Sequence, residues 1–291
     1  MKLRKIIATG AAAVVAATGL VACSSSNEAE GDVIRIGTTD SAKKAWTAFE
    51  EVAEREGYNI ELVDYADYNT PNDALDQGNI DVNQFQHLKF LANYNVGKGT
   101  DLTPIVATEI IPLAIFWKGH DSLDGIEGQS VAIPNDSTNQ GRAINVLVQA
   151  GLVTLKQEDL LEPTPADIDE AKSKVTVTPV DAAQTTVAYG EGKPAVINNS
   201  FLDRAGIDPL SSVFADDPAN PAAEPYINAF VVRADRANDQ KLIELGKLWH
   251  TKEVQDATAE DSAGTSVSVQ RTPEQLKEIT TRLQDQIKAA Q

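Results

Sequence analysis

Apolar and polar residues follow two different periods along this chain, and the two periods predict strands and helices. Residues 33–37 and 60–63 are short apolar runs with the length and the β-branched content of strands. Between them, residues 41–55 repeat apolar side chains every three or four positions, which is typical of a helix that buries one face. That face consists of Ala45, Trp46, Phe49, Val52 and Ala53.

This alternation of strand and helix continues to the end of the chain. Further strand-like segments are residues 80–83, 102–107, 110–117, 130–133, 175–180, 195–198 and 224–233. Further helical segments lie around Ala74, at residues 139–150 and 182–189, and over most of the chain after residue 233. The last helix begins at Thr272, which forms a capping box with Gln275. Strands that alternate with helices predict the α/β class, with two mostly parallel sheets flanked by helices.

Two breaks in the alternation, near Trp117 and near Tyr226, predict that the chain builds two lobes. We expect lobe 1 to consist of residues 33–115 and 229–291, and lobe 2 to consist of residues 116–228. In this arrangement two crossover strands join the lobes, and lobe 1 takes up the C-terminal helices.

The N-terminal residues 1–22 predict a lipoprotein signal peptide. Three basic residues precede an apolar stretch that ends in Leu-Val-Ala-Cys at residues 20–23. This ending is the cleavage site of a bacterial lipoprotein signal, so Cys23 is the expected site of lipidation. The alternative is an incidental cysteine after an ordinary signal peptide. The polar residues 23–32 then predict a flexible tether between the membrane and the folded part.

Composition excludes several classes of partner. Removal of the signal's three positive charges from the net charge of −18 leaves −21, which disfavours nucleic acid and anionic lipid surfaces. Cys23 is the only cysteine of the chain, so a lipidated chain forms no disulfide. The three histidines, His87, His120 and His250, are too far apart to suggest a transition-metal site. We expect no metal and no cofactor.

The sharpest chemical signal is at residues 131–142, where a strand, a polar loop and a helix start follow one another. Asp136, Ser137 and Thr138 are candidate caps of this helix. Arg142 lies near the first turn, where a cation is disfavoured unless an anion is held there. A carboxylate fits a guanidinium well. The alternative is a surface ion pair between Arg142 and a local acid such as Asp136. The sequence has no nucleotide-binding loop here.

Other polar residues lie where strands end. Asn198 follows a predicted strand and Asn228 interrupts another, and ligands of open α/β sheets bind at such ends. For Asn228 the alternative is a core amide bonded to backbone. Tyr68, Phe85 and His87 could build an apolar pocket, although each of these residues taken singly is more often ordinary core or surface. We find no nucleophile–base pair, so we expect a binding protein and not an enzyme.

Five motifs occur together in a fixed order: Tyr-Asn-Thr-Pro-Asn at 68–72, Asn-Gln-Phe-Gln-His at 83–87, Ile-Pro-Asn-Asp-Ser-Thr-Asn-Gln-Gly-Arg at 133–142, Ala-Val-Ile-Asn at 195–198 and Pro-Tyr-Ile-Asn at 225–228. Together they resemble the NlpA/MetQ family of methionine-binding lipoproteins, which capture substrate for ATP-driven methionine importers. The resemblance covers nearly the whole chain after the signal. It implies a two-lobed, type II periplasmic-binding-protein fold that closes on one amino acid.

The resemblance also implies roles for individual residues. Arg142 would bind the ligand carboxylate, with Asn139 beside it at the helix start. Asn198 and Asn228 would contact the backbone groups of the amino acid. The wall around the ligand side chain would be formed by Tyr68, Phe85 and His87.

Two departures from the family pattern, both expected near the side-chain pocket, leave the identity of the amino acid open. Ile111 precedes a proline where relatives often have an aromatic or acidic residue, and Lys89-Phe90 stands where many have Pro-Tyr. We expect L-methionine or a close relative; the alternatives are D-methionine, a methionine-containing dipeptide or another apolar amino acid. An exported enzyme or a metal-binding lipoprotein on the same fold is less favoured. The expected partners are an ABC permease and ATPase, with the receptor itself a monomer anchored to the membrane.

Overall fold

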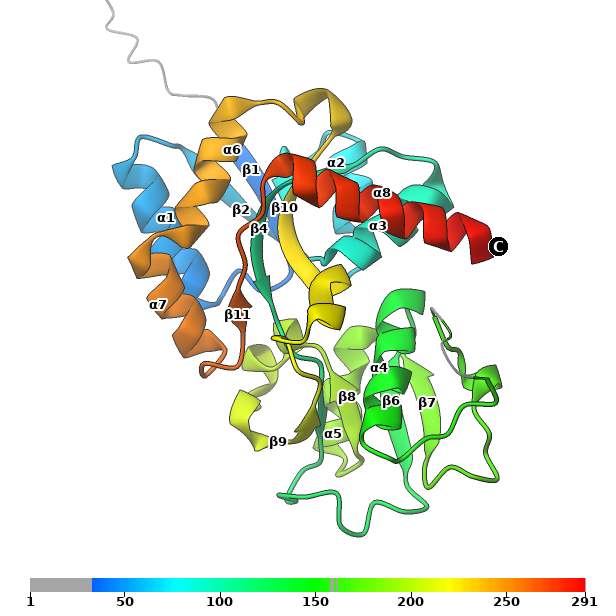
Figure 1. Ribbon diagram of the computed structural model, residues 1–291. Helices are drawn as coiled ribbons and strands as arrows, with labels where there is room; N and C mark the ends of the chain where they lie inside the picture. Colours follow the sequence, from blue (N-terminus) through cyan, green and yellow to red (C-terminus); the bar gives the residue numbers. More distant parts are fainter. Residues whose placement is uncertain (1–32, 158–159, 161, 291) are drawn as a thin grey trace, which may run out of the picture. The chain divides into compact units, whose positions relative to one another are not determined.

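The computed structural model describes residues 33–157, 160 and 162–290 (Figure 1). The predictions of a signal peptide, of lipidation at Cys23 and of a tether at residues 23–32 lie outside the described residues. Among the helices that are described, none combines the length and the apolar character needed to cross a membrane.

The first sheet is built from both ends of the described chain. Its strands are β1 (Ile34–Thr38), β2 (Ile60–Asp64), β3 (Val82–Asn83), β4 (Thr103–Ile110), β10 (Ile227–Val232) and β11 (Val267–Ser268), in the order β11-β4-β10-β3-β1-β2. Strand β1 is parallel to β2 and β3, whereas β10 is antiparallel to β3 and β4.

The second sheet is built from the middle of the chain. Its strands are β5 (Ala114–Phe116), β6 (Ser130–Pro134), β7 (Thr176–Val180), β8 (Ala195–Ile197) and β9 (Ser212–Ala215), in the order β7-β6-β8-β5-β9. Strand β6 is parallel to β7 and β8, whereas β5 is antiparallel to β8 and β9.

The predicted α/β class is confirmed, but both sheets are mixed and not mostly parallel. The antiparallel pairs arise where the chain passes between the sheets. Strand β4 leads out of the first sheet and β10 leads back into it, so the two run in opposite directions. In the second sheet β5 leads in and β9 leads out, so these two strands also run in opposite directions.

Helices lie on both faces of the first sheet (Figure 1). The α-helices are α1 (Lys44–Arg55), α2 (Pro71–Asp76), α3 (Leu88–Lys98), α4 (Ser137–Gln149), α5 (Thr185–Gly190), α6 (Gln240–Lys247), α7 (Lys252–Asp261) and α8 (Pro273–Ala290). Short 3-10 helices are η1 (Pro165–Asp167), η2 (Ala182–Gln184), η3 (Asn199–Phe201), η4 (Asp203–Ala205), η5 (Pro209–Ser211), η6 (Pro221–Tyr226), η7 (Ala234–Arg236) and η8 (Leu248–His250).

The predicted apolar face of α1 is buried as expected. The buried residues of this helix are Ala45, Trp46, Phe49, Val52 and Ala53. The Trp46 ring lies 4.9 Å from the Trp249 ring and 6.3 Å from the Phe230 ring, so α1 is anchored to β10 and η8 by aromatic contacts. The predicted capping box of α8 is also present, because Thr272 and Gln275 exchange hydrogen bonds of 3.0 and 3.3 Å.

One apolar cluster combines residues from segments next to the two sheets. Tyr68 and Phe85, which lie near the first sheet, pack in it with Ala195 of β8 and Phe201 of η3. This cluster brings the carboxyl end of β3 close to the carboxyl end of β8. It therefore positions the loops that carry the predicted ligand-binding residues.

The chain passes between the sheets at residues 111–113 and again at 216–226. The boundaries predicted for the lobes, 115/116 and 228/229, fall inside β5 and β10. Each of these strands pairs as a whole within one sheet, β5 in the second and β10 in the first. The division of the chain into two lobes that move relative to one another stays a prediction.

Candidate ligand-binding site

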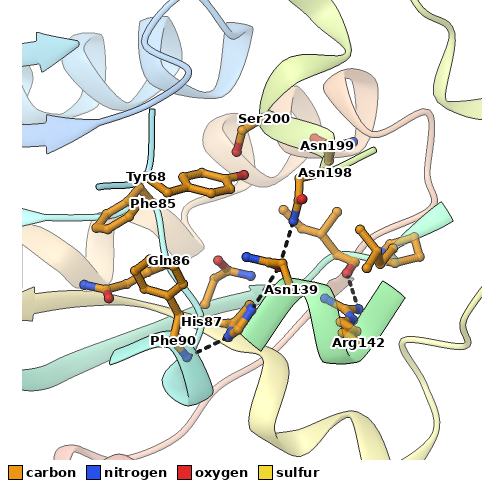
Figure 2. A pocket seen from close by; sticks show the side chains of 14 residues that line it. Tyr68, Phe85, Gln86, His87, Phe90, Asn139, Arg142, Asn198, Asn199 and Ser200 are labelled. Carbon is orange, nitrogen blue, oxygen red and sulfur yellow. Dashed lines mark hydrogen bonds between the residues drawn. The ribbon is translucent and has the colours of Figure 1, made fainter. Parts of the chain in front are cut away.

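A cavity with about 460 Å³ of empty space is lined by residues from several of these elements (Figure 2). The lining residues are Tyr68, Phe85, Gln86, His87, Phe90, Ile111, Pro112, Leu113, Asn139, Arg142, Asn198, Asn199, Ser200 and Asn228. All seven residues predicted to bind the ligand are among them, although they are spread over 160 residues of sequence (Asn228 minus Tyr68). Their role in binding stays a prediction.

Strand ends and one helix bring these residues together. Phe85 and His87 follow β3 and lead into α3, and Asn198 directly follows β8. Asn228 lies within β10, where it forms a β-bridge with His87. Asn139 belongs to α4. The predicted position at the carboxyl end of a strand is thus observed for Asn198. It is wrong for Asn228, which is the second residue of β10 and reaches the site because β10 runs antiparallel to β3.

The start of α4 is held by Asp136. Its side chain accepts hydrogen bonds from the backbone N–H of Asn139 at 2.9 Å and from the Thr138 hydroxyl at 3.1 Å. The Asn139 side-chain amide donates to the same oxygen at 2.9 Å, so the cap also fixes the Asn139 side chain. Helix α4 begins at Ser137, two residues before the predicted start. Arg142 consequently lies in the second turn of the helix and not in the first.

Arg142 is buried, with 5% of its surface exposed, and its guanidinium is held on several sides. Nε donates to Asp216 Oδ2 at 2.8 Å, and Nη2 donates to Asp216 Oδ1 at 3.1 Å and to the Ile111 carbonyl at 2.9 Å. Its Cζ lies 4.0 Å from the centre of the Tyr226 ring. The alternative of an ion pair with Asp136 is therefore wrong: the acidic partner is Asp216, 74 residues further along. Within the described residues these hydrogen bonds use Nε and Nη2, which leaves Nη1 for a ligand.

A chain of hydrogen bonds joins His87, Asn139 and Asn198 (Figure 2). His87 Nδ1 accepts from the backbone N–H of Phe90 at 3.0 Å. Burial and the charge of Arg142 lower the pKa of His87 to about 3, so the ring is neutral at pH 7. Because Nδ1 is an acceptor, the ring proton is on Nε2, which donates to Asn139 Oδ1 at 3.4 Å.

Asn198 presents an unused acceptor to this region. Its Nδ2 donates to Asn139 Oδ1 at 2.9 Å. Its own Oδ1 is buried and has no hydrogen-bond partner within the described residues. A buried oxygen of this kind is costly unless a donor reaches it, so it is the expected acceptor for a donor group of a ligand.

Asn228 has features of both predicted alternatives, a residue that faces the ligand and a core amide bonded to backbone. Its Nδ2 donates to the backbone carbonyls of Glu109 and Tyr226 at 3.3 and 3.4 Å, as a backbone-bonded core amide would. It nevertheless lines the cavity. The backbone bonds fix its amide group, so that the side-chain oxygen is held in one orientation.

Aromatic rings form one wall of the cavity. Tyr68, Phe85 and Phe90 lie with their ring centres 5.8 to 6.1 Å apart. Tyr68 is also 5.0 Å from Phe201, and burial raises the pKa of its hydroxyl, which stays neutral. An uncharged, apolar wall of this kind suits an apolar side chain.

Sequence reasoning missed the lining residues Leu113 and Ser200 and one supporting residue, Asp216. Phe90 and Ile111 line the cavity, in agreement with the expectation that the departures from the family pattern lie near the side-chain pocket. Lys89 does not line the cavity; it is buried with Nζ 3.9 Å from Glu162. Asp216 gave no local signal, because it contacts Arg142 only through the fold.

The cavity thus combines one cation, one unused buried acceptor and an apolar wall. A ligand with a carboxylate, an amino group and an apolar side chain matches all three. Within the residues that the structure describes, no group of three or more His, Cys, Asp and Glu side chains could hold a metal ion.

Comparison with known proteins decides the family. The model of the NlpA lipoprotein family matches residues 34–270. The chain belongs to the NlpA lipoprotein family. The resemblance predicted from the five motifs is therefore confirmed, and the match spans all of the elements that line the cavity.

Relatives of this NlpA-family chain are similar over most of their length. The probable D-methionine-binding lipoprotein MetQ of Vibrio cholerae is 31% identical, with 88% of this chain and 95% of the relative covered. The crystal structure of protein PG110 from Staphylococcus aureus is 35% identical with a TM-score of 0.80, over 86% of this chain and 99% of the other. A nutrient-binding protein from Burkholderia cenocepacia, solved bound to methionine, is 29% identical with a TM-score of 0.74, over 81% and 99%.

Proposed function

We propose that this protein is a receptor that binds L-methionine, or a closely related amino acid, and delivers it to an ABC importer. The observation that carries the proposal is the meeting of Arg142, the unpartnered Asn198 oxygen and the aromatic wall in one cavity. The names of the relatives support the same ligand class, because one is called a probable D-methionine-binding lipoprotein and another was solved bound to methionine.

The chemistry of the lining residues suggests how the amino acid would lie. Its carboxylate would accept from Arg142 Nη1, and its ammonium group would donate to the oxygens of Asn198 and Asn228. Burial of a zwitterion is costly unless each charge is paired, so these polar groups are needed for affinity. The thioether side chain would pack against the aromatic wall of Tyr68, Phe85 and Phe90, since sulfur contacts with rings are favourable.

Transport requires that the receptor stay close to the permease. We propose that lipidation of Cys23 anchors the protein at the outer face of the cell membrane, as the names of its relatives suggest for lipoproteins. The two segments that pass between the sheets would act as hinges when the cavity opens and closes. The expected partners are an ABC permease and its ATPase, and the receptor acts as a monomer that releases its ligand chemically unchanged.

Titration calorimetry on protein refolded without ligand tests the proposed ligand. L-Methionine should bind more tightly than D-methionine, a methionine-containing dipeptide or leucine. Mass spectrometry should then recover methionine unchanged from the complex. If none of these compounds binds, the proposed function is wrong; if another of them binds best, the ligand is reassigned within the same class.

Arg142→Ala tests the proposed binding site. Removal of one partner from a desolvated charge pair costs about 2–5 kcal/mol, so the variant should lose most of its affinity for methionine. Arg271→Ala is the matched control, because Arg271 is exposed and its guanidinium donates to the carbonyl of the preceding residue, Gln270. Calorimetry that gives Arg142→Ala the affinity of the control would show that the carboxylate binds elsewhere.

A further inference from the structure

Asp216 holds the guanidinium of Arg142 with two nearly parallel hydrogen bonds. Its two carboxylate oxygens lie 2.8 Å from Nε and 3.1 Å from Nη2. Both side chains are largely buried, with 6% of Arg142 and 13% of Asp216 exposed. A bidentate pair of this kind fixes both the position and the plane of a guanidinium.

Asp216 is itself fixed to the first segment that passes between the sheets. Its Oδ1 accepts from the backbone N–H of Leu113 at 2.8 Å, and its own N–H donates to the Leu113 carbonyl at 3.1 Å. Asp216 is also the first residue of the second such segment, directly after β9. One carboxylate therefore connects Arg142 to both segments.

Within the described residues these contacts occupy Nε and Nη2 of the guanidinium and leave Nη1. Asp216 and the Ile111 carbonyl together bind Nε and Nη2, and the Tyr226 ring covers one face. Figure 2 shows Arg142 among the side chains that line the cavity. The carboxylate of Asp216 also compensates the charge of Arg142 before any ligand is present, so the cation can stay buried in the empty site.

We propose that Asp216 is a positioning residue for ligand recognition. It orients Arg142 so that Nη1 meets the carboxylate of the ligand, and it does not touch the ligand itself. The proposal rests on the proposed function, since it assumes that Arg142 binds a carboxylate.

Asp216→Asn tests this role, because it keeps the shape of the side chain but removes the charge that orients both guanidinium nitrogens. The measurement is calorimetry with two ligands, L-methionine and L-methioninol, which lacks the carboxylate. We expect the variant to bind methionine at least tenfold more weakly than wild type, with methioninol affinity changed less than twofold. Asp217→Asn, which removes the same charge from the exposed neighbouring residue, should match wild type with both ligands.

Three outcomes would overturn the proposal. Asp216→Asn could bind methionine as tightly as wild type, or it could lose affinity for both ligands equally, which would indicate a purely structural role. Failure of wild type to bind methionine would instead overturn the proposed function together with this inference.

A measurement on the wild-type protein covers the case in which Asp216→Asn does not fold. The Nε–H proton of Arg142 should be protected from exchange with solvent in ligand-free protein, as observed by NMR, and it should stay protected when methionine is added. Rapid exchange in the ligand-free state would show that Asp216 does not orient Arg142 in advance.

Discussion

Arg142 and His87 show how the site stays stable around one buried charge. The guanidinium of Arg142 has a carboxylate partner of its own, Asp216. The His87 imidazole is kept neutral by burial and by the charge of Arg142. The remaining polar side chains around the cavity are amides and hydroxyls, which accept or donate without a net charge. A zwitterion entering such a site meets donors and acceptors already in place.

A second buried acid, Glu109, lies in a neighbouring cavity and gives a prediction about pH. Burial raises the pKa of Glu109 to about 7, and Trp249 Nε1 donates to it at 2.8 Å. Asp40 raises this pKa further and Lys43 lowers it. Because the folded pKa exceeds the value of 4.5 in the unfolded chain, the stability contributed by the protonated acid is complete below pH 4.5 and is lost as the pH rises to 7.

Glu109→Gln keeps the acceptor for Trp249 but cannot ionise. We expect the variant to be more stable than wild type at pH 8, by roughly 3 kcal/mol at most, and equal to it at pH 4. Denaturant unfolding at the two pH values measures the difference. Glu50→Gln on the exposed face of α1 is the control and should not reproduce the gain at pH 8. The same stability difference at both pH values would contradict the account.

At the scale of elements, sequence periodicity predicted the helices and strands well, and their ends less well. The buried face of α1 and the capping box of α8 follow from local spacing, which is visible in the sequence. The start of α4 could not be predicted from local spacing, because Asp136, Ser137 and Thr138 are all good caps. In the structure Asp136 caps the helix, and its carboxylate also accepts a hydrogen bond from the side-chain amide of Asn139.

Packing between α6 and β4 gives a prediction at this scale. A methyl group added to Gly246 of α6 would lie 2.9 Å from Val106 Cγ2 and 3.5 Å from the Phe230 ring. Gly246→Ala should therefore destabilise the protein by about 1–3 kcal/mol, as overpacking does. Gly97→Ala is the matched control, since Gly97 lies in α3 with no atom within 4 Å of an added methyl group. It should be neutral or stabilising by up to about 1 kcal/mol.

These two variants are compared by thermal and denaturant unfolding under the same conditions. If Gly246→Ala is as stable as Gly97→Ala, then α6 does not pack against β4 as closely as described.

At the scale of the whole molecule, the fold class and the set of lining residues could be predicted, but the long-range pairs could not. Motif order and the resemblance to a family placed all seven residues at one cavity. The pairing of Arg142 with Asp216 depends on how β9 runs beside β5, and nothing local indicates it. The mixed sheets were missed for a similar reason, because apolar runs show that a strand exists and not its direction.

The central claim concerns one amino acid held by one guanidinium, and a crystal structure of the protein with L-methionine tests it most directly. The account predicts the methionine carboxylate within hydrogen-bond distance of Arg142, its ammonium group at the Asn198 oxygen, and its side chain against Tyr68 and Phe85. Electron density for methionine in another cavity, or an Arg142 guanidinium without contact to the carboxylate, would contradict it.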